Sequence, residues 1–296
     1  MSRKKQLSCL YTLSNRGSRN YRRVTIDKKD GGSRTLLVPC GLLKGVQRNI
    51  LHHVLDERPV SSCAQAYRKT DIRGNASCHL GKKLVLKLDI SHFFDSILFP
   101  RVYGAAFPET LFPPAAAMLL TSLCCCNERL PQGSPASPAI SNLVMRPFDI
   151  YMDGWCRERG IAYTRYCDDM TFSGDFDAAA LCSKVRSYLE AMGFTLNEKK
   201  TKLLTGDVRQ SVTGIVVNDK LQVSREYRKK LRQEVYYCKK YGIDAHLERV
   251  EADTGIRWEK ERYICSVQGR LRFVLQVNPQ DDEFAGYCRE WKELFM

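Results

Sequence analysis

The chain has 296 residues, of which 44% are hydrophobic, so it is long enough for one large domain or a few smaller lobes and too apolar for wholesale disorder. Its net charge of +14 comes from 47 Lys and Arg against 33 Asp and Glu. No run of eighteen apolar residues occurs, and the basic start Met-Ser-Arg-Lys-Lys-Gln lacks the apolar stretch of a signal peptide, so we expect a cytoplasmic protein with no membrane partner.

The first third of the chain contains a basic segment, a helix and a strand. Asp30-Gly31-Gly32 is a turn signal that precedes Arg34. The segment Leu42–Leu55 has apolar residues at helical spacing, which predicts a helix. Leu84–Ile90 alternates between Leu or Ile and other residues. This pattern predicts a strand with one buried face and with Asp89 on the opposite face.

The rest of the chain mixes both kinds of element and is predicted to end in helices. The order contains no regular βαβ repeat, which argues against a doubly wound sheet. The predicted elements are a helix that starts in Pro135–Phe148, two strands at Ile161–Arg165 and Met170–Ser173, a helix over Ala178–Met192, a short strand at Leu221–Val223, and two further helices over Arg225–Tyr241 and Trp258–Val277.

Positive charge is concentrated in two segments. Residues 1–34 hold ten Lys and Arg and two acids, and residues 225–241 hold seven and two. Such clusters suit a phosphate backbone. A solvated basic surface would give the same pattern.

The thirteen cysteines include no C-x-x-C pair, and their number is odd. Cys124-Cys125-Cys126 lies in an apolar segment, where cysteine behaves as a small hydrophobic residue. We therefore expect reduced and mostly buried thiols rather than a zinc site or a disulfide framework.

Two adjacent carboxylates lie between two predicted strands, in Tyr166-Cys167-Asp168-Asp169. Adjacent strand side chains point to opposite faces, so both acids can serve one site only at a tight turn. Turn chemistry alone would also explain an isolated Asp-Asp. A third acid, Asp89, ends its own strand. If the strands are neighbours, three carboxylates converge, and two Mg²⁺ ions about 3.5–4 Å apart would relieve their repulsion and promote phosphoryl displacement.

The segments around these acids resemble reverse transcriptases. Four motifs in the family order carry the resemblance, which covers most of residues 20–280: Lys87–Phe94, Leu130–Pro138, Tyr166–Asp169 and Gly193–Thr201. The resemblance implies an α+β right-hand polymerase. Its parts would be fingers at 1–85 and 100–130, an antiparallel-sheet palm at 86–99 and 131–223, and a helical thumb at 224–296. It also implies RNA-templated DNA synthesis from deoxynucleotides with Mg²⁺, or with Mn²⁺ in its place.

The resemblance assigns roles around the acids. Asp89, Asp168 and Asp169 would be catalytic and would ligate metal together with Ile90. Phe94 would exclude the 2′-hydroxyl, although a core Phe is the alternative and Phe93 suits that place better. Gln132 would line the nucleotide pocket. Arg34, together with Lys28 or Lys29, would bind the triphosphate. Lys200 would donate a proton to the leaving pyrophosphate, and Lys199 is nearly as good a candidate for this role. Solvated basic residues would explain these last positions as well.

Within the family, the chain is most similar to bacterial retron enzymes. Asn75-Ala76-Ser77-Cys78-His79 and Val212-Thr213-Gly214 resemble two retron elements, and Gly269–Phe273 followed by Asn278-Pro279 resembles the thumb. The residues expected to bind RNA are Asn75, His79, Val212, Thr213, Gly214, Arg228 and Arg232. The segment Ala66–Arg73 departs from the pattern, which leaves open whether Arg68, Lys69 or Arg73 contacts nucleic acid. The short region before Tyr21 predicts a reduced leading helix.

The retron resemblance implies partners and a product. A structured non-coding RNA would be template and primer, and the nascent cDNA would remain joined to it as branched RNA–DNA (msDNA). An effector protein for anti-phage defence would be a further partner. The alternatives are a group II intron-like or diversity-generating reverse transcriptase, and a catalytically silent RNA-binding scaffold of polymerase fold.

Overall fold

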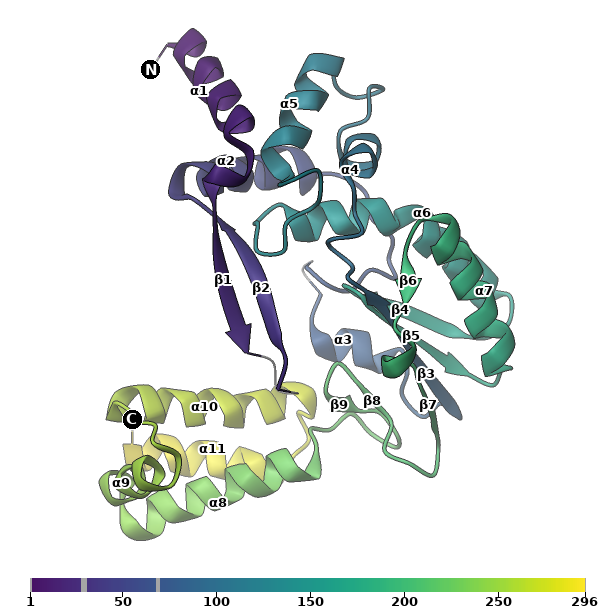
Figure 1. Cartoon of the computed structure of the whole chain (residues 1–296). Helices are drawn as coiled ribbons and strands as arrows, with labels where there is room; N and C mark the ends of the chain where they lie inside the picture. Colours follow the sequence, from purple (N-terminus) through teal and green to yellow (C-terminus); the bar gives the residue numbers. More distant parts are fainter. Residues whose placement is uncertain (1, 28–30, 68–69, 296) are drawn as a thin grey trace. The chain divides into compact units, whose positions relative to one another are not determined.

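The computed structural model describes residues 2–27, 31–67 and 70–295, and the chain forms two units (Figure 1). The first unit comprises Met1–Asp71 and Leu84–Leu203, and the second comprises Ile72–Lys83 and Leu204–Met296. Each unit therefore contains two separate stretches of the chain. None of the helices within the described residues is long and apolar enough to span a lipid bilayer.

The first unit begins with helix α1 (Arg3–Arg16), a 3₁₀ turn η1 (Gly17–Asn20) and a hairpin of β1 (Tyr21–Asp27) and β2 (Ser33–Pro39). The leading helix before Tyr21 is present as α1, which is 14 residues long. Leu13 of α1 is only 5% exposed, and the Asn20 side chain donates to the Leu13 carbonyl at 2.7 Å. Burial and this hydrogen bond at its C-terminal end stabilise a helix that has few apolar residues.

A five-stranded sheet, antiparallel along β4-β5-β3-β6, forms the centre of the first unit. Its strand order is β4-β5-β3-β6, and β7 also pairs with β3. The face of β3 that carries Asp89 was expected to be open, but Val85 and Asp89 on it are 0% and 4% exposed. A strand in the middle of a sheet has few open positions, and on that face Lys87 and Ser91 are half-buried. The strands are β3 (Leu84–Ser91), β4 (Ala162–Tyr166), β5 (Asp169–Gly174), β6 (Thr195–Leu196) and β7 (Lys202–Thr205).

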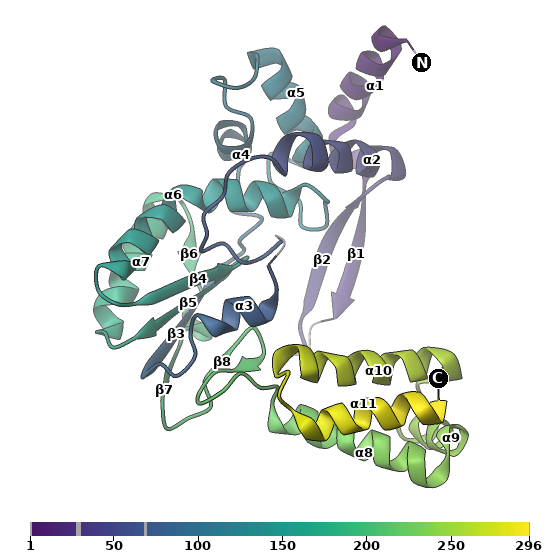
Figure 2. The ribbon, with the colours of Figure 1, turned by 180° about the vertical axis from the view of Figure 1, so that it is seen from behind.

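Helices pack against this sheet and enclose one hydrophobic core. The view from behind shows α6 and α7 lying side by side against the sheet (Figure 2). Helix α6 continues nine residues past Phe148 despite Pro147, because Met152 and Cys156 prolong its buried stripe. The helical segments are α2 (Gly41–Ile50), the π-helical turn η2 (Leu51–Leu55), α4 (Phe99–Ala106), α5 (Pro114–Cys124), α6 (Ser137–Arg157), α7 (Ala178–Ala191) and the 3₁₀ turn η3 (Glu198–Lys200). The predicted helices at Leu42–Leu55 and Ala178–Met192 are confirmed.

The second unit combines a small α/β element with four helices. Its elements are α3 (Ile72–Ser77), β8 (Ser211–Val212), β9 (Ile215–Val216), α8 (Arg225–Tyr241), α9 (Ile243–Thr254), α10 (Lys260–Val277) and α11 (Asp282–Phe295). The prediction of a C-terminal helical lobe is confirmed, and α8 has the predicted bounds. The predicted strand Leu221–Val223 is wrong, because only Gln222 forms a bridge, to Val216.

All thirteen cysteines are free thiols. Cys124, Cys125 and Cys126 are 0%, 6% and 4% exposed, and burial raises the pKa of Cys125 to about 12. These thiols therefore belong to the packed interior, as predicted for the triplet.

Candidate active site

The two adjacent acids lie at the tip of the β4–β5 hairpin. Tyr166 and Asp169 are paired across the hairpin, so Cys167 and Asp168 form a two-residue turn. Cys167 has a φ of +62°, in the left-handed region that two-residue hairpin turns require. The turn interrupts the strand alternation next to Asp169. The predicted placement of Asp168-Asp169 at a tight turn is confirmed.

The third acid lies directly beside this turn. Strand β3 pairs with β5 so that Asp89 is opposite Asp169. The main-chain N–H of Ile90 donates to the Asp168 carbonyl at 3.2 Å. Three carboxylates are thus held at one end of the sheet. They come from two segments of the chain, and at least 79 positions separate Asp89 from the other two acids.

Negative charge at this point is only partly balanced. Lys200 Nζ lies 2.8 Å from Asp89 Oδ2, and this hydrogen bond raises the pKa of Lys200. Partial burial, followed by the charges of Asp168 and Asp89, raises the pKa of Asp169 to about 6, although Lys87 lowers it. Burial first, and the neighbouring carboxylates second, thus disfavour a charged Asp169 unless another cation is present.

The chemistry of these donors fits a magnesium ion. Carboxylate oxygens of Asp89, Asp168 and Asp169, with the main chain of Ile90 beside them, are the hard ligands that Mg²⁺ prefers. Within residues 2–27, 31–67 and 70–295, however, no group of three His, Cys, Asp or Glu side chains is already arranged to hold a metal. Lys200 supplies positive charge at Asp89 instead, so metal binding at Asp89 requires this ammonium to withdraw or share the carboxylate.

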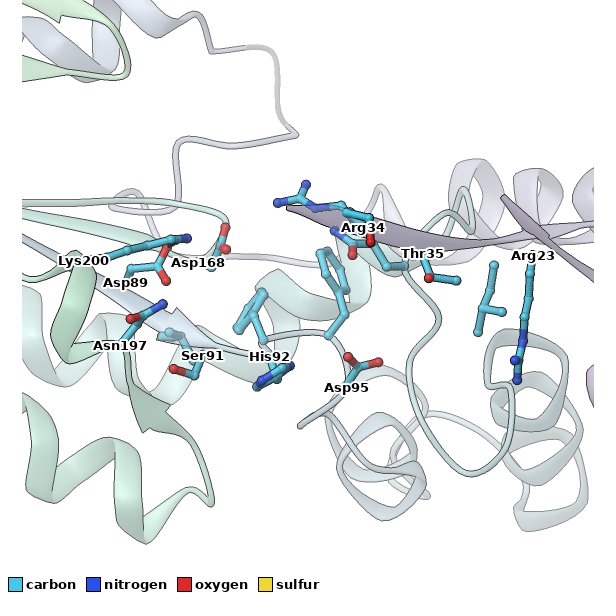
Figure 3. Close-up of a pocket in the computed structure, with 16 residues that line it drawn as sticks. Arg23, Arg34, Thr35, Asp89, Ser91, His92, Asp95, Asp168, Asn197 and Lys200 are labelled. Carbon is cyan, nitrogen blue, oxygen red and sulfur yellow. Dashed lines mark hydrogen bonds and ion pairs between the residues drawn. The ribbon is translucent and has the colours of Figure 1, made fainter. Parts of the chain in front are cut away.

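A cavity of about 520 Å³ opens in front of these acids. In Figure 3, Asp89, Asp168 and Lys200 gather at one end, and Arg23 lies at the other. The cavity draws its walls from the β1–β2 hairpin, the end of β3, the loop after α5 and the segment after β6. The predicted site residues that line it are Arg34, Asp89, Ile90, Phe94, Gln132, Asp168 and Lys200; Asp169 is not among the lining residues.

The loop that carries Gln132 is fixed to the hairpin. The Leu37 N–H donates to the Gln132 carbonyl at 2.7 Å. Gly133 has a φ of +119°, and a Cβ at this position would lie 2.9 Å from the Leu37 carbonyl oxygen. Only glycine permits this close approach, so the Gln132 side chain keeps a defined place in the wall.

The two phenylalanines after β3 have different environments. Phe93 is 3% exposed and packs 5.8 Å from the Phe194 ring, which confirms it as the core residue. Both side chains border the cavity, but Phe94 is half-buried whereas Phe93 is buried. Phe94 is therefore the more accessible of the two to a molecule bound there.

The structure adds cavity residues that the sequence had not indicated, namely Arg23, His92, Asp95 and Asn197. Arg23 is opposite Leu37 in the hairpin, so it shares a face with a lining residue. Strand alternation could have found it if the register of the hairpin had been known. His92 has a φ of +47°, a local turn that no spacing pattern predicts.

Two other segments, 28–29 and 68–73, contain basic residues that are candidate contacts to nucleotide and nucleic acid. Lys28 and Lys29, and also Arg68 and Lys69, lie outside the described residues. The Nε of Arg73 donates to the Val277 carbonyl at 3.1 Å. Arg73 therefore already has a partner within the second unit.

The two retron-like elements meet in the second unit. Helix α3 packs on β8 and β9, and Asn75 Nδ2 donates to Thr213 Oγ1 at 3.5 Å. Asn75, His79 and Val212 are 1%, 0% and 0% exposed. Gly214 is exposed, at the turn between the two strands. The buried residues thus support a turn in which Thr213 and Gly214 are the ones near solvent.

Arg228 and Arg232 of α8 both contact acids of the α11 region. Arg228 forms ion pairs with Asp281 and Glu283, and its side chain is 11% exposed. Arg232 pairs with Glu283 and is 40% exposed. Burial alone would raise the pKa of Asp281, yet hydrogen bonding from Arg228 holds it below its usual value. Arg228 thereby joins two helices, whereas Arg232 keeps an exposed edge.

Comparison with known proteins identifies the relatives of the chain. The family described as reverse transcriptase (RNA-dependent DNA polymerase) matches residues 26–241. The Retron Mx65 reverse transcriptase of Myxococcus xanthus is 34% identical over 90% of this chain, and the chain spans 63% of that protein. The Retron Ec86 reverse transcriptase of Escherichia coli is 32% identical over 87% of this chain and 77% of that protein.

The fold has a solved counterpart in a polymerase of another kind. The structure of telomerase from Candida albicans in complex with a fragment of telomeric RNA matches 97% of this chain and 67% of that one, with a TM-score of 0.51 and 11% identity. The architecture is therefore the mixed α+β right-hand polymerase fold. On the family match and the identity to these relatives, the chain belongs to the reverse transcriptase family and, within it, to the retron reverse transcriptases.

Proposed function

We propose that the chain is an RNA-directed DNA polymerase that extends a primer with deoxynucleotides. The cavity carries this proposal, because it brings two of the three clustered acids, Asp89 and Asp168, together with Phe94, Gln132 and Arg34. A purely structural acid cluster would need neither a cavity of nucleotide size nor cationic side chains along its wall. We also retain the division into fingers, palm and thumb as a proposal.

Each side chain has a role that its position supports. Arg34 binds triphosphate oxygens, for which a planar guanidinium is suited. Gln132 packs against the nucleotide, and Asp89, Asp168 and Asp169, with Ile90, would hold Mg²⁺ or Mn²⁺. The metal, when bound, supplies Lewis-acid activation of the primer hydroxyl and neutralisation of phosphate charge. Lys200, whose Nζ donates to Asp89 Oδ2 at 2.8 Å, is the candidate proton donor to pyrophosphate.

The first experiment tests the chemistry of the acids. Asp168→Asn with Asp169→Asn should abolish incorporation of labelled deoxynucleotides on an RNA template. Asp219→Asn, which removes an exposed carboxylate, is the matched control and should leave incorporation unchanged. Normal synthesis by the double variant would contradict the assignment.

A second experiment tests the choice of sugar. Phe94→Ala should admit ribonucleotides, because the half-buried ring would no longer fill the space beside C2′. Phe107→Leu, a change at a fully buried position outside the cavity lining, should preserve the discrimination. Equal discrimination by the Phe94 variant and the native protein would remove Phe94 from this role.

At the finer level, we propose that the RNA is a dedicated structured non-coding RNA and that the product is branched RNA–DNA. The chain spans 63% of one retron relative and 77% of another, and their names support the proposal. The exposed turn at Thr213-Gly214, supported by Asn75 and His79, would contact the RNA by shape and by its 2′-hydroxyls. An anti-phage role with an effector protein is part of the same proposal.

Sequencing of nucleic acid that copurifies with the chain separates the candidates. Branched RNA–DNA supports the retron proposal. Intron RNA would favour a group II intron-like enzyme, and RNA without any attached DNA would favour a silent scaffold. The Asp168→Asn/Asp169→Asn variant is the control, since it should bind the same RNA without DNA.

A further inference from the structure

A fully buried ion pair lies just behind the double-aspartate turn. Arg165, at the end of β4, and Asp149 of α6 are both 0% exposed. Arg165 Nε donates to Asp149 Oδ1 at 2.8 Å, and Nη2 donates to Oδ2 at 2.6 Å. The Tyr163 hydroxyl also donates to Oδ1, at 2.9 Å. Because apolar residues of similar volume often replace such pairs without loss of stability, burial alone does not explain an arginine here.

The remaining guanidinium nitrogen binds the turn itself. Arg165 Nη1 donates to the main-chain carbonyl of Cys167 at 2.8 Å. Cys167 has a φ of +62°, a conformation that residues other than glycine adopt infrequently. The next carbonyl, of Asp168, accepts from the Ile90 N–H. Both peptide groups of the turn are therefore fixed, one by Arg165 and one by β3, and together they set the direction of the Asp168 side chain.

Arg165 also joins the turn to the segment 63–67. Its main-chain N–H donates to the Cys63 carbonyl, and its own carbonyl accepts from the Gln65 N–H, both at 2.8 Å. The Tyr67 hydroxyl donates to Cys167 Sγ at 3.4 Å. Movement of Arg165 would thus loosen the turn on both sides.

We propose that Arg165, held by Asp149, is a positioning residue of the polymerase centre, which orients the Cys167 peptide and thereby directs the Asp168 carboxylate into the cavity. This inference rests on the proposed function, because orientation of Asp168 matters for activity only if Asp168 takes part in nucleotide transfer. Lysine cannot replace arginine in this role, because its ammonium lacks the planar fork that reaches Asp149 and Cys167 together.

Two variants remove the contact with Cys167 by different routes. Arg165→Lys keeps a charge for Asp149, and Arg165→Met with Asp149→Leu replaces the pair by apolar side chains, so that no charge is left buried alone. The matched controls change Arg157 and Asp153, an ion pair on α6, the helix of Asp149, with Nη2 and Oδ2 2.7 Å apart and side chains that are 70% and 21% exposed. They are Arg157→Lys and Arg157→Met with Asp153→Leu.

Primer extension should separate positioning from folding. Both Arg165 variants should lower kcat about tenfold to a hundredfold, as expected when a reacting group is misplaced by about 1 Å. The KM for deoxynucleotide and the affinity for RNA should stay unchanged, because Arg34, Gln132 and the RNA-contacting turn are untouched. Unchanged kcat in both variants, or a uniform loss of kcat, nucleotide KM and RNA affinity, would overturn the proposal.

Alkylation of Cys167 by iodoacetamide, resolved by peptide mass spectrometry, tests the turn without any catalysis. Cys167 is 7% exposed and Cys156 is 0% exposed. In the Arg165 variants Cys167 should react several-fold faster, with Cys156 unchanged. Unchanged Cys167 reactivity, or an equal increase at Cys156, would overturn the positioning role. If the native chain proves inactive as a polymerase, the proposed function fails, while this comparison still decides whether Arg165 fixes the turn.

Discussion

At the scale of single residues, burial can change the charge state of a side chain, and His79 is an example. His79 is 0% exposed, and burial, with a smaller effect of Lys82, lowers its pKa to about 4. The unfolded chain therefore binds a proton that the folded chain does not between about pH 6.5 and pH 4. The stability due to neutral His79 is complete above pH 6.5 and is lost as the pH falls through this window.

We predict that His79→Gln removes this pH dependence. The native protein should lose up to about 3 kcal/mol of unfolding free energy between pH 6.5 and pH 4 through this residue, and the variant should lose correspondingly less. Urea unfolding at a series of pH values measures the difference. His52→Gln, which changes a histidine with 61% side-chain exposure, is the control. Parallel pH profiles of native protein and His79 variant would contradict the prediction.

Gly133 gives a second prediction at this scale. Gly133→Ala should destabilise the chain by about 1–3 kcal/mol and raise the KM for deoxynucleotide, because the new Cβ would displace the Gln132 loop from Leu37. Thermal unfolding and primer-extension kinetics measure both effects. Gly154→Ala in α6, where nothing lies within 4 Å of the added carbon, should be neutral or slightly stabilising. Equal behaviour of the two alanine variants would contradict this account.

Single residues were predictable where a short motif fixes their surroundings. Asp89, Asp168 and Asp169 meet because a two-residue turn and an adjacent strand leave few other arrangements. Arg23 and His92 were not predictable, because one depends on hairpin register and the other on a positive φ. The sequence also gave no sign that His79 is buried, since burial depends on the packing of distant segments.

At the scale of elements, helix α8 separates two uses of basic residues. Arg228 is committed to Asp281 and Glu283 and lies 4.5 Å from the Phe284 ring centroid. Arg225 and Lys229 are exposed on the same cavity wall. Within about one turn of α8, Arg228 stabilises the structure, whereas Arg225 and Lys229 are available to bind phosphate groups.

We predict opposite effects from two arginine variants of α8. Arg228→Met should lower the unfolding free energy by about 3–5 kcal/mol, since it leaves the buried Asp281 carboxylate unpaired. Arg225→Met should leave stability nearly unchanged and should reduce the salt dependence of RNA binding by about one phosphate contact. Urea unfolding and filter binding at several salt concentrations measure the two effects. A loss of stability in Arg225→Met together with a reduced salt dependence of RNA binding in Arg228→Met would contradict this division.

The elements themselves were largely predictable, because hydrophobic period and capping are local signals. Helices α7 and α8 begin where the side chains of Asp177 and Ser224 accept main-chain N–H groups. The extent of α1 was not predictable, because burial of Leu13 against distant segments helps to stabilise this helix. The strand expected at Leu221–Val223 is limited to the bridge between Gln222 and Val216, because its partner β9 has only two residues.

On the scale of the whole molecule, the net charge of +14 predicts that RNA binding and chemistry can be separated. Asp168→Asn with Asp169→Asn should bind structured RNA at least as tightly as the native chain, because the change removes negative charge near the phosphates. Filter binding together with labelled-nucleotide incorporation tests this. A loss of RNA affinity in the inactive variant would show that the acids support the RNA-bound structure itself.

The fold class was predictable from the four motifs, whereas the grouping of the chain was not. Residues Ile72–Lys83 belong with the C-terminal unit, although they lie far from it in the sequence. Contacts such as Asn75 with Thr213 create this grouping. No local sequence pattern indicates these long-range contacts.

The pairing of residues 63–65 with Arg165 also has a consequence for solubility. Strand β4 is the outermost strand of its sheet, and an outermost strand with unpaired main-chain groups can recruit strands from other molecules. Cys63 and Gln65 already occupy the main-chain N–H and carbonyl of Arg165. At that position a segment of the same chain shields the edge of the sheet, which leaves no template there for intermolecular β-aggregation.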